Sequence, residues 1–251
     1  MPCRRQIRVT LSSSPARRRR RQLETKHILV GRRLPCLSGI KVCSCPGGSA
    51  CGGRSHTVTE HDVDSNTPVD PDEAADLIPS HIETRAELNA WEQANIAKAA
   101  DWLSTRRGGS TVLTLEFMRE SHRRMFDETW KWAGKFRTTA KNIGVPAATI
   151  QESLRNLLDD VSYWIENNAY PRDEICTRFH HRLVQIHPFP NGNGRHGRLM
   201  TDLLLHELGA QPFTWGSANL IAQGDARASY IGALKQADAG NYESLLEFVR
   251  S

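Results

Sequence analysis

A short stretch of the chain, residues 187–198, concentrates the groups that could do chemistry: His-Pro-Phe-Pro-Asn-Gly-Asn-Gly-Arg-His-Gly-Arg. It holds an imidazole at His187, a glycine-rich turn at 192–194, and guanidinium groups at Arg195 and Arg198. An imidazole titrates near neutral pH and can accept a proton from an attacking hydroxyl. Backbone amides of a glycine turn and guanidinium groups both suit phosphate oxygens. The combination indicates a site that holds a nucleotide's phosphates next to a base.

The flanking apolar pattern predicts the elements that position these groups. Residues 195–208 carry apolar side chains at helical spacing before Gly209, so the turn should lie at a helix N-terminus, where free amides favour anions. A preceding helix over 173–186 should end at His187, because Pro188 disfavours helical backbone before it. Gly-Asn-Gly alone would suit an ordinary turn with solvated arginines, but the full string favours the phosphate site.

The other aromatic and histidine side chains nearby are expected to be structural. Phe189 is interpreted as a core anchor for the loop rather than a substrate contact. A lone histidine is more often structural than catalytic. We therefore expect structural or surface positions for four further histidines: His180, His181, His196 and His206.

The string resembles the signature of the Fic (Fido) family, His-x-Phe-x-Asp/Glu-Gly-Asn-Gly-Arg-x-x-Arg. The resemblance extends over residues 113–251, less specifically back to about Thr67, and looks most like the subgroup called mobile mystery protein B. It implies an all-α helical bundle with one small β-hairpin flap, and transfer of AMP from ATP to a Ser, Thr or Tyr hydroxyl of a target protein. It also implies that the family's toxin role, with a small antitoxin or regulator as partner, applies here.

The resemblance also implies a role for each signature residue. His187 would be the general base. Gly192, Asn193 and Gly194 would form the anion nest. Arg195 and Arg198 would hold the β and γ phosphates.

Asn191 departs from the family pattern, which has an acidic Mg²⁺ ligand at this position. An amide oxygen can coordinate a hard cation but brings no negative charge. The donor could therefore be Mg-ATP or another phosphate-linked compound, or the chain could be a catalytically weak nucleotide- or partner-binding protein. The presence of His187 favours an enzyme, because binding alone needs no base. Asn191 could also be a simple turn residue.

Two short β-prone runs, at 133–139 and 141–145, surround a turn and predict a hairpin. By resemblance this hairpin is the flap that docks the target segment as an added strand. The residues expected to contact the target are Lys141, Asn142 and Ile143.

Glu92 is the nearest match to an inhibitory element that some family members carry, Ser/Thr-x-x-x-Glu-Gly/Asn, whose glutamate pairs with the second signature arginine. The match is incomplete, since Leu88 stands at the Ser/Thr position and Gln93 follows the glutamate. The sequence therefore favours a solvated glutamate on the face of a helix.

Charge is distributed unevenly along the chain. The formal net charge is +5, yet residues 1–57 hold 13 Lys and Arg against one acidic residue, and the remainder holds 20 against 27. The acidic balance of the remainder argues against direct nucleic-acid binding by the domain. No run approaches eighteen apolar residues and no apolar segment follows the basic start, so we expect no membrane span and no secretory signal. Five of the six cysteines lie in residues 1–51, and Cys176 in the domain is expected to be a buried thiol, which suits a reducing cytoplasm.

These patterns divide the chain into three parts. Residues 1–57 form a disordered, Arg- and Cys-rich extension, residues 58–112 a linker and an N-terminal helix, and residues 113–251 the Fic domain. The extension could instead be an overextended reading frame, because composition changes abruptly near Val58 and a valine codon can serve as a bacterial start. Mass spectrometry of the native N-terminus would decide, and peptides from residues 1–50 would refute the shorter start.

Overall fold

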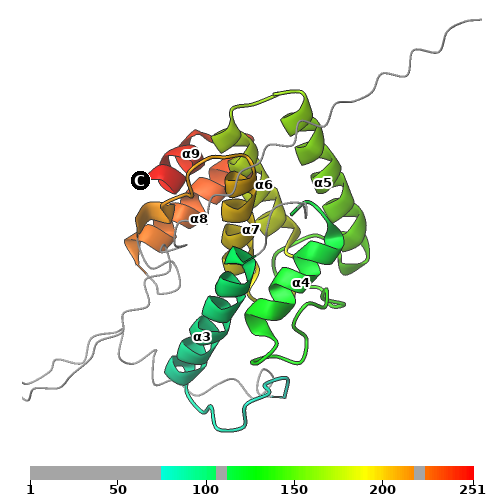
Figure 1. The fold of residues 1–251 in the computed structure, drawn as a ribbon, viewed down its shortest axis with the longest axis vertical. Coiled ribbons are helices and arrows are strands. Elements are labelled where there is room, and N and C mark those ends of the chain that lie inside the picture. Colours follow the sequence, from blue (N-terminus) through cyan, green and yellow to red (C-terminus); the bar gives the residue numbers. More distant parts are fainter. Residues whose placement is uncertain (1–74, 106–111, 218–223) are drawn as a thin grey trace, which may run out of the picture. The chain divides into compact units, whose positions relative to one another are not determined.

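The computed structural model describes residues 75–105, 112–217 and 224–251. This part of the chain is helical and contains no strand; an isolated β-bridge joins Leu77 and Trp130. The expected all-α architecture is confirmed, while the expected disordered tail lies outside the described residues. In the labels of Figure 1 the helices are α3 (Arg85–Ser104), α4 (Leu115–Phe126), α5 (Ile150–Glu166), α6 (Arg172–Ile186), α7 (Asn193–Glu207), α8 (Asp225–Asp238) and α9 (Glu243–Arg250), with short 3₁₀ turns at Ala147–Thr149 and Trp215–Ser217.

Capping residues set where the first helices begin. At α3, Thr84 and Glu87 form a reciprocal capping box. At α4, Thr114 Oγ1 accepts a hydrogen bond from the Phe117 amide at 3.1 Å. Within the described ranges, no helix is long and apolar enough to cross a membrane.

The α6–α7 pair lies at the centre of the bundle and carries the signature loop between its helices (Figure 1). A Cβ on Gly197 of α7 would come 3.1 Å from Val184 Cγ2 of α6, so the glycine permits a close approach of the two helices. The surrounding core contains fully buried Phe179, Leu183 and Met200. His180, His181 and His196 are also buried and hydrogen-bonded within the fold, whereas His206 is exposed, in line with their expected structural or surface positions.

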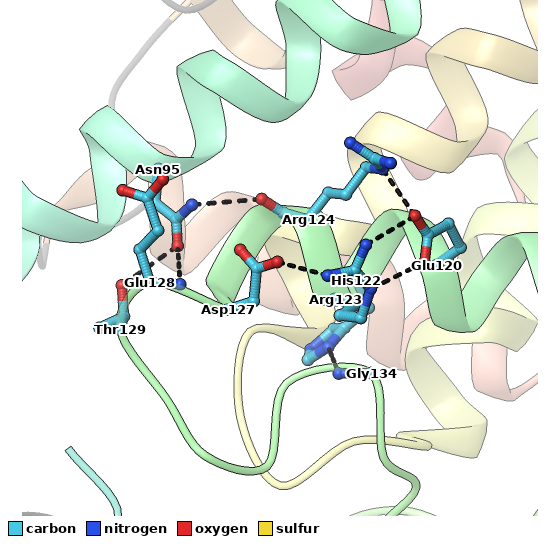
Figure 2. A network of polar contacts seen from close by, with 9 residues as sticks. All are labelled: Asn95, Glu120, His122, Arg123, Arg124, Asp127, Glu128, Thr129 and Gly134. Carbon is cyan, nitrogen blue, oxygen red and sulfur yellow. Dashed lines mark hydrogen bonds and ion pairs between the residues drawn. The ribbon is translucent and has the colours of Figure 1, made fainter. Parts of the chain in front are cut away.

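A buried asparagine fixes α3 against the end of α4 (Figure 2). Asn95 Nδ2 donates to the Arg124 carbonyl at 3.2 Å, and its Oδ1 accepts from the Glu128 amide at 3.1 Å and from Thr129 Oγ1 at 3.3 Å. A side chain that satisfies three partners with almost no solvent contact holds one geometry. Glu92 lies one turn earlier on the same helix, so this attachment also determines where Glu92 points.

The expected hairpin at 133–145 is not formed: this segment is a loop with no β-ladder. The carbonyls of Thr139 and Val145 are instead both bound by the guanidinium of Arg137. A side chain therefore holds the loop's two ends, where paired strands would have used their own backbone groups. Gly134 and Gly144 have positive φ values of 73° and 103°, which also depart from extended backbone.

Candidate functional site

The loop at 188–192, between α6 and α7, is held by the side chain of Asn193. Its Nδ2 donates to the Phe189 carbonyl at 2.8 Å and its Oδ1 accepts from the Phe189 amide at 2.9 Å. The Phe189 ring is fully buried and stacks on His122, with ring centroids 3.6 Å apart. Phe189 is thus the core anchor that the sequence predicted. The Asn193 side chain is committed to the loop, so only its backbone amide is available to a ligand.

His122 connects this loop to the first residues of the flap segment, 133–145. Its Nδ1 accepts a hydrogen bond from the Gly134 amide at 3.0 Å (Figure 2). Its Nε2 donates to the Asn191 carbonyl at 3.1 Å. Burial holds the pKa of His122 well below its usual value, so the ring stays neutral and keeps one donor and one acceptor. The ring therefore couples the two loops that flank the site.

The N-terminus of α7 is open to an anion. Gly192 precedes the helix with φ at 77°, and a Cβ there would lie 2.5 Å from Phe126 Cζ, so this position requires glycine. No side chain caps the helix, and the first backbone bond outside its regular ladder runs from the His196 amide to the Gly192 carbonyl at 2.9 Å. The amides of Asn193, Gly194 and Arg195 precede that bond and can donate to phosphate oxygens.

Asn191 is exposed, and its Oδ1 accepts a hydrogen bond from the next amide, that of Gly192, at 2.7 Å. This is the behaviour of a turn residue. Within the described residues, no group of three or more His, Cys, Asp and Glu side chains could hold a metal ion. At the position where the family pattern has its acidic Mg²⁺ ligand, this site therefore offers an amide and no carboxylate.

His187 ends α6 in left-handed backbone, with φ at 53° and ψ at 60°. Its ring is half-buried, and its buried Nδ1 has no hydrogen-bond partner of acceptable geometry, although the Val184 carbonyl is close enough to act on the ring. Burial, with the positive charges of Arg137 and Lys141, lowers the pKa of His187, and the Val184 carbonyl opposes this shift. The imidazole is therefore neutral at pH 7, which is the form that can accept a proton.

Arg198 lies on the inner side of α7, facing α8. The phenol of Tyr230, whose hydroxyl lies 2.7 Å from His180 Nε2, is close enough to act on its guanidinium. Burial raises the pKa of Tyr230 to about 12, so the partner of Arg198 is neutral. A Cβ on Gly194 would come 3.9 Å from a terminal nitrogen of Arg198, which places this cation beside the open helix end. The carboxyl of Asp202 lies farther along α7 and, with its pKa raised to about 6 by burial, also acts on Arg198.

Arg195 faces α3 instead and is bound by a carboxylate. Its guanidinium lies 2.6 Å from Glu92 Oε2, and the Trp130 indole donates to Glu92 Oε1 at 2.7 Å. Glu92 is only 4% exposed, so the expectation of a solvated glutamate is wrong. The physical reason is that Trp130 and Arg195 cover it from segments distant in the sequence. The pairing also differs from the family's inhibitory pattern, since Glu92 binds the first signature arginine and not the second.

The target-binding flap residues are placed on the surface. Lys141 and Asn142 are exposed, and the Ile143 side chain is 61% exposed. An exposed apolar side chain in a loop beside His187 suits a docking role, although that role stays a prediction.

Four residues that shape the site were not identified from the sequence: Arg137, His122, Tyr230 and Asp202. Only His122 and Arg137 carry a signal in hindsight, as a histidine on an apolar helix face and a cation in a β-prone run.

Comparison with known proteins agrees with this geometry. Residues 112–205 match the family model described as the Fic/DOC family. A protein adenylyltransferase, fic-1 of Caenorhabditis briggsae, is 28% identical over 141 residues, which is 55% of this chain and 26% of that protein. The protein adenylyltransferase Fic of Drosophila grimshawi is also 28% identical over 141 residues, 55% of this chain and 28% of that protein. The chain spans about a quarter of the length of these curated relatives.

Solved structures show the same fold. The N-terminal Fic domain of Bep8, a VirB-translocated effector from Bartonella sp. 1-1C, aligns with a TM-score of 0.53 at 18% identity, covering 68% of this chain and 88% of that one. BepC from Bartonella tribocorum, solved with bound AMPPNP, aligns with a TM-score of 0.53 at 17% identity over 67% of this chain and 87% of that one. The helical fold and the signature loop agree with the match of residues 112–205 to the Fic/DOC family model.

Proposed function

We propose that this chain is an ATP-dependent protein adenylyltransferase with His187 as its general base. The observation that carries the proposal is the half-buried, neutral imidazole that ends α6, joined by the short loop at 188–192 to an uncapped helix end with Arg198 beside it. The names of the curated relatives support the same reaction. AMPPNP in the BepC structure supports a nucleotide as the donor.

The proposed step is a displacement at the α phosphorus of ATP. The hydroxyl oxygen of a target Ser, Thr or Tyr forms a bond to the phosphorus, the bond from that phosphorus to the bridging oxygen breaks, and pyrophosphate leaves. His187 takes the hydroxyl proton as the new bond forms. The amides at the start of α7 and the guanidinium of Arg198 offset negative charge on the β and γ phosphates. Lys141, Asn142 and Ile143 dock the target segment along the flap.

Asn191 supports a second candidate, transfer of another phosphate-linked group or weak catalysis. Its Oδ1 already accepts from Gly192, and it adds no charge for a divalent cation. The enzyme remains the better proposal, because a binding protein has no need of a neutral imidazole at this helix end.

The finer assignments belong to the same proposal. Resemblance over residues 67–251 supports membership of the mobile mystery protein B subgroup, and with it a bacterial toxin role and a small antitoxin partner. The acidic balance of the domain supports the absence of direct nucleic-acid binding. Its single cysteine, Cys176, suits a reducing cytoplasm. Purification of the natively expressed protein, followed by mass spectrometry of co-purifying small proteins, tests the partner.

Replacement of the base tests the proposed reaction. His187→Ala should lower transfer of label from α-labelled ATP to host-lysate proteins by about 10²- to 10⁴-fold, the usual effect of losing a general base. ATP affinity, measured by calorimetry, should be unchanged. His206→Ala is the matched control, because this exposed histidine lies at the other end of α7. Transfer by His187→Ala at the wild-type rate would overturn the mechanism.

A panel of labelled nucleotides and nucleotide-linked donors tests the choice of ATP. The labelled residue is then mapped by mass spectrometry. AMP on a Ser, Thr or Tyr side chain supports adenylylation, whereas label from another donor alone would favour the second candidate.

A further inference from the structure

Arg137 is a buried cation whose hydrogen bonds all run to main-chain carbonyls. Only 4% of the residue is exposed. Its Nε donates to the His187 carbonyl at 2.7 Å, one terminal nitrogen donates to Thr139 at 3.0 Å, and the other donates to Val145 and, at 3.4 Å, to Ile186. The carbonyls of Ile186 and His187 belong to the end of α6. Those of Thr139 and Val145 lie at the two ends of the exposed part of the flap. One planar guanidinium therefore joins the flap to the helix that carries the base.

The main chain repeats this connection. The Arg137 amide donates to the Pro188 carbonyl at 2.9 Å, and the Val145 amide donates to the Ile186 carbonyl at 3.3 Å. These bonds anchor the flap where it leaves and where it returns. The residues between them, 138–144, are exposed. The flap thus has an exposed middle part, while both of its ends are hydrogen-bonded to the residues on either side of His187.

Gly144 shows how closely the flap approaches the base. A Cβ at this position would lie 2.7 Å from His187 Cβ and 2.6 Å from a terminal nitrogen of Arg137. Such distances leave no room for a side chain, so the flap backbone itself packs on His187. A displacement of the Arg137 fork would shift both the flap and the imidazole.

The charge of Arg137 acts on the same ring. After burial, the positive charge of Arg137 is the largest cause that lowers the pKa of His187, followed in the same direction by Lys141 on the flap, while the Val184 carbonyl of α6 acts in the opposite sense. The carbonyls at the C-terminal end of α6 also favour a cation at this point. Arg137 can therefore stay charged among carbonyls while it disfavours a second charge on His187.

We propose that Arg137 is a positioning residue that holds the target-docking flap and the His187 imidazole in one fixed arrangement. The proposal rests on the proposed roles of His187 and the flap. Lysine cannot replace arginine here, because an ammonium is a compact charge and cannot span four carbonyls in the plane of a fork. Charge and geometry can therefore be separated by substitution.

The test measures the fold's own properties in the full chain, before any activity. Arg137→Gln should speed hydrogen exchange of the Val145 amide by about tenfold or more, since this amide depends on the fixed flap end. The pKa of the His187 ring, followed by NMR, should rise toward its ordinary value of 6.5 in the same variant. Arg137→Lys should speed the exchange but keep the pKa low.

The matched control is Arg119→Gln. Arg119 lies beside the same segment and donates to the Gly134 carbonyl at 3.0 Å, away from Thr139, Val145 and the end of α6 that Arg137 binds. It should change neither the exchange of Val145 nor the pKa of His187. If Arg137→Gln does not fold, Arg137→Lys decides alone: fast exchange at Val145 supports the proposal, and wild-type exchange overturns it. Unchanged exchange and unchanged pKa in Arg137→Gln would also overturn it.

Kinetics then connect the arrangement to transfer. Arg137→Lys should raise the KM for the protein target more than it lowers kcat, because the flap docks the target while the base keeps its charge state. In Arg137→Gln the acid limb of the pH–rate profile should move to higher pH, with the pKa of His187. Exchange and NMR pKa do not require activity, so they remain decisive even if adenylylation itself is not found.

Discussion

The two signature arginines lie one turn apart on α7 and face opposite sides of the site. Arg195 faces α3, where Glu92 binds it at 2.6 Å with a full negative charge. Arg198 faces α8, where the neutral phenol of Tyr230 acts on it more strongly than the buried carboxyl of Asp202. A carboxylate in direct contact competes with phosphate for a guanidinium, whereas a neutral phenol does not.

Because of this difference, the guanidinium of Arg198 can accept a phosphate, whereas that of Arg195 is already occupied by a carboxylate. Burial lowers the pKa of Arg198, so its cation is desolvated and would gain strongly from an anion beside it. Arg195 must first lose Glu92, which is itself buried and also bound by Trp130. The α8 side of the site is therefore prepared for phosphate, while the α3 side opposes it.

The largest expected effect comes from removing the prepared arginine. Arg198→Ala should weaken triphosphate binding by about 10- to 100-fold, because a hydrogen bond to a charged group contributes about 1.5–3 kcal/mol and 1.4 kcal/mol is tenfold. Arg195→Ala should weaken it less, since Glu92 already occupies that guanidinium. Monophosphate binding should change little in both variants. Calorimetry with ATP and AMP checks this, and equal losses for both arginines would refute the proposed asymmetry.

A gain, rather than a loss, is expected on the α3 side. Glu92→Gln keeps an acceptor for Trp130 but removes the negative charge that pairs with Arg195. ATP affinity and transfer should therefore rise by up to roughly tenfold, the value of one charge-assisted bond. Isothermal calorimetry and the labelling assay measure this. Glu128→Gln is the control, because its ion pair with Lys98 lies on the exposed side of the same α3–α4 contact. Unchanged affinity in Glu92→Gln would mean that Arg195 takes no part in binding.

The smallest effect is expected between the two sides, at Asn191. Asn191→Asp adds a charge beside the phosphate loop, so transfer from ATP should increase a few-fold and depend more steeply on Mg²⁺, which bridges phosphate oxygens in such reactions. Initial rates over a Mg²⁺ titration check this. Lower activity, or an unchanged Mg²⁺ dependence, would favour a donor other than ATP.

The sequence predicted the α6–α7 part of the site well, because its information is local. Helical spacing and Pro188 placed His187 at a helix end, and the glycines placed an open N-terminus after it. Helix α7 begins at Asn193, two residues earlier than the expected 195, because Gly192 adopts the left-handed backbone that precedes the helix. The domain boundaries at 57 and 112 stay predictions.

The surroundings of the site could not be predicted because their partners are distant in sequence. Glu92 and Arg195 are separated by 103 positions, and helical periodicity carries no information about such a pair. The expected hairpin failed for a related reason. The runs at 133–139 and 141–145 are β-prone in sequence, but the bonds that hold them come from a side chain, Arg137, and from the end of α6, so no strands form.

The attachment of α3 by Asn95 affects how Glu92 can leave Arg195. It holds the helix through two bonds to main-chain atoms of Arg124 and Glu128 and one to the Thr129 hydroxyl, and none of these bonds involves Glu92. Glu92 can therefore leave Arg195 by rotating its own side chain, while the helix stays in place. Shifts of packed helices take microseconds to milliseconds. Exchange of the carboxylate for a phosphate at Arg195 would then require Glu92 to leave Trp130 as well, but no such shift of α3.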